Sequence, residues 1–318
     1  MNYSDNSINI LTAKTYNRIG GAWIVKNLKG GEPIETIVSL LNRDAREAHP
    51  ITTGDFEMRK ERIERDILKL NGSADGVIAI GDKGFPQHRG KVKNSGQPIA
   101  LFYKGDLSLL ELSNRNIAVI GLRNPDDYTG MIEREVVAEL VKNGAVIVSG
   151  LALGCDSIAH REALLLKGKT AAFLPSPLSD ILPAANIELA KEIVKGGGLL
   201  ATEYYNNPNS VPEQRGRYQE RDRLQAMFSD CVILSASYAE NDMGNDSGSR
   251  FAMNYASDYG IPRAVIYDTE TDENNPKYDL NRQLIKERKE ITVINREQLH
   301  LSIKRIIGSR QPNILDFM

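Results

Sequence analysis

Residues 215–223 place four arginines and a tyrosine within nine positions. Guanidinium groups form planar forks that match phosphate oxygens, and an aromatic ring among them offers a face on which a base can stack. The surrounding segment 116–274 has 14 Lys and Arg against 23 Asp and Glu, a formal charge of −9, so these arginines are not part of a generally basic surface. The composition therefore predicts a local phosphate site that includes Arg215, Arg217, Tyr218, Arg221 and Arg223.

The same run also fits an alternative without any ligand. Its arginines would then pair with Glu213, Glu220 and Asp222 on a solvated surface, because runs of charge are commonly exposed faces. Both interpretations stay open at this point.

Two further segments combine glycine with groups that bind anions. Gly121 would let the backbone approach a phosphate, and Arg123 would supply positive charge. In the second segment, Gly150 and Gly154 are expected to leave amides free beside Ser149 at the start of a helix. The alternative for Gly121 is a glycine that ends a strand beside an exposed arginine.

A third segment offers hydroxyl and amide donors at the start of another helix, at Ser247, Gly248 and Ser249. Ser247 could instead be only the N-cap of that helix. For Asp156 and His160 we favour structural roles, as a helix cap and as a hydrogen-bonded residue under a loop, because the sequence places no second acid, base or nucleophile beside them. We therefore predict no catalytic residue.

Short apolar runs alternate with amphipathic stretches after residue 72. The runs lie at 77–80, 99–103, 117–120, 145–148, 171–174, 199–202, 231–234 and 264–267, with a later one at 291–294. Near-continuous apolar runs are typical of strands buried on both faces, as in a parallel sheet covered by helices. We therefore expect an α/β fold. In such sheets ligands bind at the carboxyl ends of the strands, which is where the loops above would meet.

The helices follow from apolar spacings of three and four. Over 129–144 the apolar stripe is expected to leave Glu133 on another face, with Thr129 as the cap. Residues 1–72 are predicted to form a small helical N-terminal domain, 73–270 the sheet domain and 271–318 a basic C-terminal extension. Within that extension we expect a polar linker at 269–275 and a helix over 280–290.

Whole-chain properties exclude several classes of protein. A net charge of −2 over 318 residues argues against a protein that coats nucleic acid through bulk charge. Cys155 and Cys231 are the only cysteines, so neither a disulfide framework nor a cysteine-rich zinc site is expected, and no cofactor or metal is predicted. The first 21 residues lack a basic segment followed by an apolar run, and no stretch of 18 apolar residues occurs, which predicts a cytoplasmic protein without a membrane segment.

The order of the motifs resembles that of the DNA-processing protein A family, also called Smf. The most specific part is the long block over 148–160, Val-Ser-Gly-Leu-Ala-Leu-Gly-Cys-Asp-Ser-Ile-Ala-His. Further parts lie at 117–123, at Arg221-Asp222-Arg223 and at 247–249. The resemblance implies an extended Rossmann-like domain, a helical N-terminal domain, homodimers and no established turnover. It also implies that Arg123 contacts single-stranded DNA, which members of the family hand to the RecA recombinase.

The chain departs from the family pattern at three places. Leu122 stands where the family usually has serine, and Asp222 stands where it has asparagine, so that a carboxylate is expected among phosphate-facing groups. Pro175-Ser-Pro177 replaces a glycine-x-glycine segment.

Two functions of different class are therefore considered. The first is a non-catalytic protein that binds single-stranded DNA and assists a RecA-type recombinase in DNA processing or uptake. The second is an enzyme or sensor for a nucleotide or ADP-ribose derivative, since the fold also resembles the phosphoribohydrolases of the lysine-decarboxylase-like (LOG) family. The segment 246–254 lacks the glycine run and the catalytic glutamate of those enzymes, which favours binding. A dehydrogenase is disfavoured because no Gly-x-Gly-x-x-Gly follows an early strand.

Overall fold

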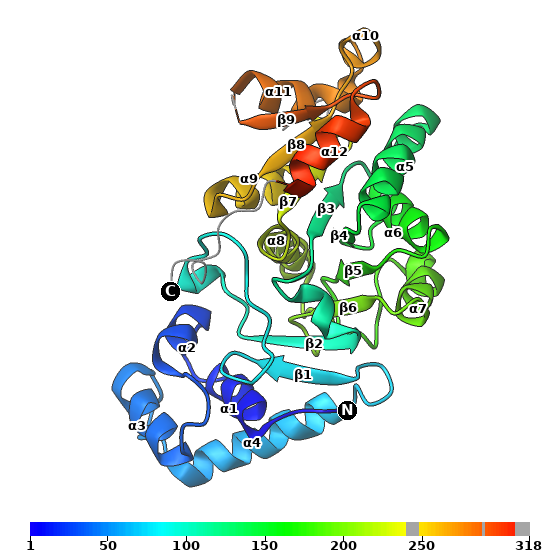
Figure 1. Cartoon of the computed structure of the whole chain (residues 1–318). Coiled ribbons are helices and arrows are strands. Elements are labelled where there is room, and N and C mark those ends of the chain that lie inside the picture. The colour runs from blue at the N-terminus through cyan, green and yellow to red at the C-terminus, as the bar shows by residue number, and fades with distance from the viewer. Residues whose placement is uncertain (240–247, 288–289, 309–318) are drawn as a thin grey trace.

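The computed structural model describes residues 1–239, 248–287 and 290–308. Within these residues, nine strands form a single sheet in the order β1-β2-β6-β5-β4-β3-β7-β8-β9 (Figure 1). The strands are β1 (Gly76–Ala79), β2 (Ala100–Gly105), β3 (Asn116–Ile120), β4 (Val146–Ser149), β5 (Thr170–Phe173), β6 (Leu199–Thr202), β7 (Cys231–Leu234), β8 (Arg263–Ile266) and β9 (Ile291–Ile294). The α/β fold and all nine expected strands are confirmed.

The sheet is not wholly parallel, which corrects the expectation from the apolar runs. β2 pairs antiparallel with both β1 and β6, while all pairs from β6 to β9 are parallel. Parallel neighbours need a crossover, usually a helix, whereas antiparallel strands can be joined directly. Between β1 and β2 the chain forms only the short 3-10 helix η1 (Asn94–Gly96), so no crossover helix returns it to a parallel direction.

Helices cover both faces of the sheet (Figure 1). Side chains of β3 alternate between the two faces: Ile117 and Val119 join a core with α5 and α6, and Ala118 and Ile120 join one with α8 and α9. On the first face lie α5 (Asp127–Lys142), α6 (Cys155–Leu165), α7 (Ile187–Lys195) and α12 (Leu299–Gly308). On the second lie α8 (Val211–Met227), α9 (Ser249–Tyr259) and α11 (Asp279–Glu287).

Helix α5 corrects two local expectations. Its N-cap is Asp126, whose carboxylate accepts a hydrogen bond from the Thr129 amide at 2.8 Å, so Thr129 is not the cap. Glu133 does not lie on the exposed face, because it is completely buried. Its carboxyl group lies beside Cys155 and Ser235.

The first 72 residues form four helices against the β1 edge of the sheet (Figure 1). A capping box of Thr52 and Asp55 begins the longest of them. Their buried residues belong to one apolar cluster that also includes residues of β2, β6 and α7. The helices are α1 (Asp5–Ala13), α2 (Gly21–Asn27), α3 (Ile34–Asp44) and α4 (Thr53–Leu68). The division of the chain at residues 72 and 270 stays a prediction.

The C-terminal segment adds an edge to the sheet, because β9 pairs with β8. A short helix, α10 (Thr269–Asp272), occupies the place of the expected linker, and its N-cap Asp268 accepts from the amide of Glu270. The helix expected over 280–290 is α11, which ends at Glu287; residues 288 and 289 lie outside the described part. The remaining short 3-10 helices are η2 (Leu107–Leu110), η3 (Ala184–Asn186) and η4 (Pro276–Tyr278).

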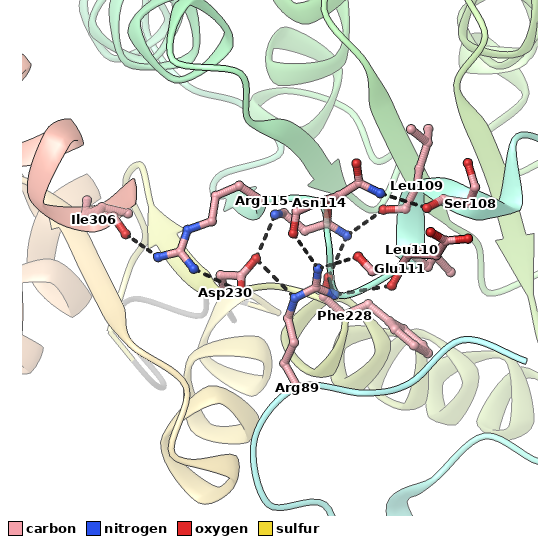
Figure 2. A network of polar contacts seen from close by, with 11 residues as sticks. Arg89, Ser108, Leu109, Leu110, Glu111, Asn114, Arg115, Phe228, Asp230 and Ile306 are labelled. Carbon is pink, nitrogen blue, oxygen red and sulfur yellow. Dashed lines mark hydrogen bonds and ion pairs between the residues drawn. The ribbon is translucent and has the colours of Figure 1, made fainter. Parts of the chain in front are cut away.

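A partly buried ionic network ties the amino ends of β3 and β7 together (Figure 2). Asp230 accepts a hydrogen bond from the Asn116 amide at 2.8 Å and pairs with Arg89 at 3.1 Å and Arg115 at 3.2 Å. Arg89 also donates to the carbonyl of Phe228 at 3.0 Å. Arg89 lies in the connection between β1 and β2, so the network anchors that connection to the amino ends of β3 and β7. It lies at the opposite end of β3 from the loop that begins at Gly121.

Candidate functional site

A cavity of about 660 Å³ opens at the carboxyl ends of β3 and β7, where the sequence predicted a site. Four segments of the described chain supply most of its walls, and Pro183, Tyr238 and Lys277 complete them. The loop after β3 contributes residues 121–124, the loop after β4 contributes Ala152 and Leu153, α9 contributes Ser249 and Ala252, and α8 contributes Arg215, Tyr218, Arg221, Asp222 and Gln225.

The run of arginines is helical, and the helix sorts its side chains by face. Ser210 caps α8 by accepting from the Glu213 amide, and a proline in the first turn supports the start. With 3.6 residues per turn, positions three or four apart share a face. Arg215, Tyr218 and Arg221 accordingly reach the same cavity.

The remaining two arginines lie elsewhere. Arg217 pairs with Glu213 at 2.6 Å and lies over the ring of Tyr204, 4.1 Å from its centroid. Arg223 pairs with Glu203 at 2.7 Å and lines a neighbouring cavity. The pair of Arg217 with Glu213 is one that the ligand-free alternative expected. Arg223 instead pairs with Glu203, which lies outside the run, and neither arginine lies on a solvated surface, since their side chains are 4% and 13% exposed.

The rim of the cavity presents positive charge and an aromatic ring. Arg123 and Arg215 are exposed, and neither makes an ion pair within residues 1–239, 248–287 and 290–308. Tyr218 lines the same cavity and is 36% exposed. Lys277 also reaches the rim, but its ammonium group pairs with Asp126 at 3.2 Å. Arg123 and Arg215 are therefore the cations best placed to meet an incoming phosphate.

The floor of the cavity is a buried polar cluster, which we define as Asp156, Arg221, Asp222 and Gln225. Each of these four residues is at most 7% exposed. Arg221 pairs with Asp156 at 3.6 Å and with Asp222 at 3.3 Å, and the Gln225 amide nitrogen donates to Asp222 at 3.0 Å. Burial raises the pKa of Asp222 to about 7; Arg221 opposes the rise and Asp156 adds to it. The floor therefore combines a guanidinium group with carboxyl groups in a space of low polarity.

Asp156 braces the loop after β4 and is not a helix cap. Its Oδ2 atom accepts from the amides of Gly150 at 3.1 Å and Ala152 at 3.2 Å. The Gly150 amide is thus not free, contrary to the expectation from sequence. The N-cap of α6 is Gly154, whose φ of +74° favours glycine and whose Cβ position would lie 2.3 Å from the Leu122 carbonyl.

Three further predicted residues have contacts that hold the framework. The hydroxyl of Ser149 donates to the Val119 carbonyl at 2.7 Å and is fully buried, so it does not face the cavity. At Gly121 a Cβ atom would lie 2.6 Å from the Cys155 Sγ atom, so close packing requires this glycine. Ser249 donates to the Gly121 carbonyl at 3.0 Å.

Gly248 and Ser249 both line the cavity at the start of α9. Gly248 is exposed and provides no side-chain cap. Ser247, which the sequence grouped with them, lies outside the described residues. Leu122, one of the three departures from the family pattern, is buried against Cys155 and Tyr278, so its side chain contributes to packing behind the cavity wall.

Two fully buried titratable groups, His160 and Glu133, are held in their uncharged forms at neutral pH. His160 is completely buried, contacts the Thr170 hydroxyl at 2.7 Å, and has a pKa lowered to about 3 by burial and by the charge of Arg221. Its expected structural role is confirmed. Burial raises the pKa of Glu133 to about 8, although Cys155 and Ser235 favour its ionised form. The burial of Glu133 was not predicted, because no local feature of the sequence distinguishes this residue from the exposed acids of α5.

Among the described residues, no group of three or more His, Cys, Asp or Glu side chains is arranged to hold a metal ion. None of the helices in this part of the chain is both long and apolar enough to cross a bilayer.

Comparison with known proteins places the cavity in a family context. A family model described as DNA recombination-mediator protein A matches residues 76–304. The DNA processing protein DprA of Streptococcus pneumoniae is 39% identical over 170 residues, covering 53% of this chain and 57% of that protein. DprA of Bacillus subtilis is 28% identical over 180 residues, covering 57% and 58%. The matches to Bacillus subtilis DprA and to the Smf proteins of Synechocystis and Borreliella burgdorferi span 58%, 39% and 61% of those proteins' lengths.

Two solved structures are also similar. The X-ray structure of DprA from Streptococcus pneumoniae has a TM-score of 0.68 at 24% identity, covers 98% of this chain and 100% of that one, and shows the same fold. The structure of DNA processing protein A from Helicobacter pylori has a TM-score of 0.56 at 28% identity, covering 72% of this chain and 100% of that one. The latter is described as giving insight into a single-stranded DNA binding mode of that protein.

Proposed function

The chain belongs to the DNA recombination-mediator protein A family, as its motifs suggested, and from this premise we propose that it binds single-stranded DNA in the cavity at the carboxyl ends of β3 and β7. The observation that carries the proposal is the rim: Arg123 and Arg215 have no ion-pair partner in the described residues and lie on the same cavity as the half-exposed ring of Tyr218. The Helicobacter pylori relative, described as a binder of single-stranded DNA, supports it.

In this proposal each group has a role set by its exposure. Arg123 and Arg215 neutralise backbone phosphates, and Tyr218 stacks on an unpaired base. A duplex hides its bases from Tyr218, and its stiff backbone cannot avoid the acidic surface of segment 116–274. Single strands are therefore the preferred form.

We propose that binding proceeds without chemical turnover. His160 is neutral, completely buried and engaged by Thr170, and the Glu133 carboxyl is likewise shut away from the cavity surface. Neither is placed to exchange a proton with a ligand at the rim. The family description as a recombination mediator supports a partnership with a RecA-type recombinase. We further propose, from the family resemblance alone, that the chain acts in the cytoplasm as a homodimer. Light scattering at micromolar concentration tests the dimer, and a monomer at every concentration would contradict it.

The function is tested by fluorescence anisotropy with a labelled single strand, the matching duplex and competing mononucleotides in one buffer. We expect tight binding of the single strand, weaker binding of the duplex and little competition by mononucleotides, since these lack neighbouring phosphates. Equal affinity for both DNA forms would contradict the proposal. Strong competition by a mononucleotide, with its hydrolysis, would instead support the nucleotide-derivative enzyme considered from sequence.

A further inference from the structure

A second cavity, of about 760 Å³, lies between helix α4 and the loops that follow β5 and β6. The loop after β5 contributes Pro177 and Ser179, and the loop after β6 contributes residues 205–207. Pro177 belongs to the segment in which the chain departs from the family pattern, and the cavity at β3 and β7 does not use it. Both loops leave the carboxyl ends of their strands, so this second cavity opens at the same edge of the sheet as the first.

The two cavities lie close together along that edge. Within one loop, Ser179 lines the second cavity and Pro183 lines the first, and four residues of chain span at most about 14 Å. Arg217 donates to the Asn206 carbonyl at 2.6 Å, which joins the wall of the second cavity to α8 beside Tyr218 of the first. A nucleotide strand advances by about 3.4 Å per nucleotide in a duplex and by more when it is extended. About four nucleotides or fewer therefore connect the two cavities.

Helix α4 presents positive charge to the second cavity. Three cations line it, Arg59, Arg62 and Lys69, against the single acid Asp66, a formal charge of +2. Arg62 is exposed and makes no ion pair or side-chain hydrogen bond within the described residues. Lys69 pairs with Asp66 at 2.6 Å, but at 74% and 32% exposure such a pair contributes little, so a phosphate can replace it. Arg59 is engaged, because it pairs with Glu47 at 3.3 Å.

We infer that the second cavity holds the phosphate backbone of the same single strand where it continues beyond the first cavity, so that α4 is part of the DNA-binding surface. A concave surface of net positive charge attracts a polyanion, even though the chain as a whole carries a net charge of −2. Arg62 and Lys69 neutralise phosphates. Asn207, an exposed residue of the same cavity, donates its side-chain amide to a phosphate or sugar oxygen. The inference rests on the proposed function, because it describes the path of the bound strand.

The test measures the affinities of a short and a long single strand, of about 4 and about 16 nucleotides, by competition against a labelled strand in anisotropy. The short strand occupies the first cavity alone, whereas the long strand reaches both. Arg62→Ala should weaken binding of the long strand about fivefold at about 0.1 M salt, because losing one phosphate contact lowers the slope of log affinity against log salt by about 0.7. The short strand should keep its wild-type affinity and slope. Arg123→Ala should weaken binding of both strands, because Arg123 lines the first cavity.

Arg65→Ala is the matched control, because Arg65 is an exposed arginine of the same helix that does not line the second cavity. It should leave both affinities at their wild-type values. Wild-type affinity of Arg62→Ala for the long strand would overturn the inference. Equal weakening by Arg65→Ala would also overturn it, since the effect would then come from the general charge of α4.

The same measurements separate this inference from the function on which it rests. If Arg123→Ala weakens binding of both strands while Arg62→Ala changes neither, the inference fails and the proposed function stands. A short strand that Arg62→Ala weakens as much as the long one would overturn the inference as well, because the strand would then not depend on the first cavity for entry. Failure of the wild type to bind either strand would instead contradict the proposed function.

Discussion

The Nη1 atom of Arg221 lies 1.0 Å from the point where a Cβ atom would stand at Gly150. The guanidinium therefore occupies the space that any other residue would fill at this position. Through it α8 is joined to the loop after β4, since Asp156 pairs with Arg221 and also accepts the Gly150 amide. The glycine that the sequence suggested for a phosphate cradle thus makes room for an arginine of the protein itself.

Gly150→Ala is expected to expel Arg221 from its place between Asp156 and Asp222. Breaking a buried ion pair from one side costs about 3–5 kcal/mol, so the free energy of unfolding should fall by roughly that amount. Because both changes disrupt one contact, Gly150→Ala and Arg221→Ala should be strongly non-additive in a double-mutant cycle measured by urea unfolding.

Gly216→Ala is the control for this cycle. It also adds one methyl group, but the space around Gly216 in α8 is open. Replacing a helical glycine by alanine typically stabilises by roughly 0.5–1 kcal/mol. If Gly150→Ala were as stable as Gly216→Ala, the close approach of Arg221 to Gly150 would be refuted.

Arg123→Ala and Arg215→Ala should each weaken single-strand binding without changing the melting temperature, because both side chains are exposed and unpaired within the described residues. Each lost phosphate contact should reduce the slope of log affinity against log salt by about 0.7. A salt series measured by anisotropy gives both quantities. Arg161→Ala is the control, since Arg161 is exposed on α6 at a different groove. Wild-type slopes in both cavity variants would place the DNA elsewhere.

The strands were predictable because each is an apolar run of local sequence. The direction of β1 and β2 was not, since it depends on whether the connection between them forms a crossover helix. Similarly, the sequence showed four arginines within nine residues, but their division between cavity and framework depends on the phase of α8 and on partners such as Glu203 and Asp156.

The features of the site that the sequence did not predict depend on buried polar contacts. Ser149 and Asp156 were recognised as polar groups at the carboxyl end of a strand, yet their bonds go to a neighbouring strand and to a loop. In its sequence position, Glu133 resembles any other acid of an amphipathic helix, although it is fully buried in the structure. Sequence spacing shows which residues share a helix face, but not how far a neighbouring element covers that face.

Stability should depend on pH through Glu133. Its pKa is about 8 in the folded protein, against an ordinary value of 4.5, so the folded state holds a proton that the unfolded state has released between these values. The stabilisation is complete below about pH 4.5 and is lost as the pH rises to about 8, with a slope of at most about 1.4 kcal/mol per pH unit. Glu133→Gln should remove this slope.

Urea unfolding of wild type and Glu133→Gln from pH 5 to pH 9 measures the difference between the two proteins. We expect the variant to gain relative stability steadily up to about pH 8. A difference that stays constant over the range would show that Glu133 does not retain its proton in the folded state.

Asp230→Asn should destabilise the fold without altering the cavity. Asp230 pairs with both Arg89 and Arg115, which are at most 15% exposed, and the amide that replaces it removes the negative charge from both ion pairs. We expect a loss of about 3–5 kcal/mol in the free energy of unfolding. The network lies at the amino end of β3 (Figure 2), whereas the cavity begins at Gly121 after its carboxyl end. Single-strand affinity should therefore stay at the wild-type value at a temperature where the variant is folded.

Glu188→Gln is the control for this prediction. It breaks an exposed pair with Lys191 and should change the free energy of unfolding by no more than about 0.5 kcal/mol. Reduced affinity in folded Asp230→Asn, with an unchanged melting temperature, would mean that the network controls the cavity and does not merely support the sheet.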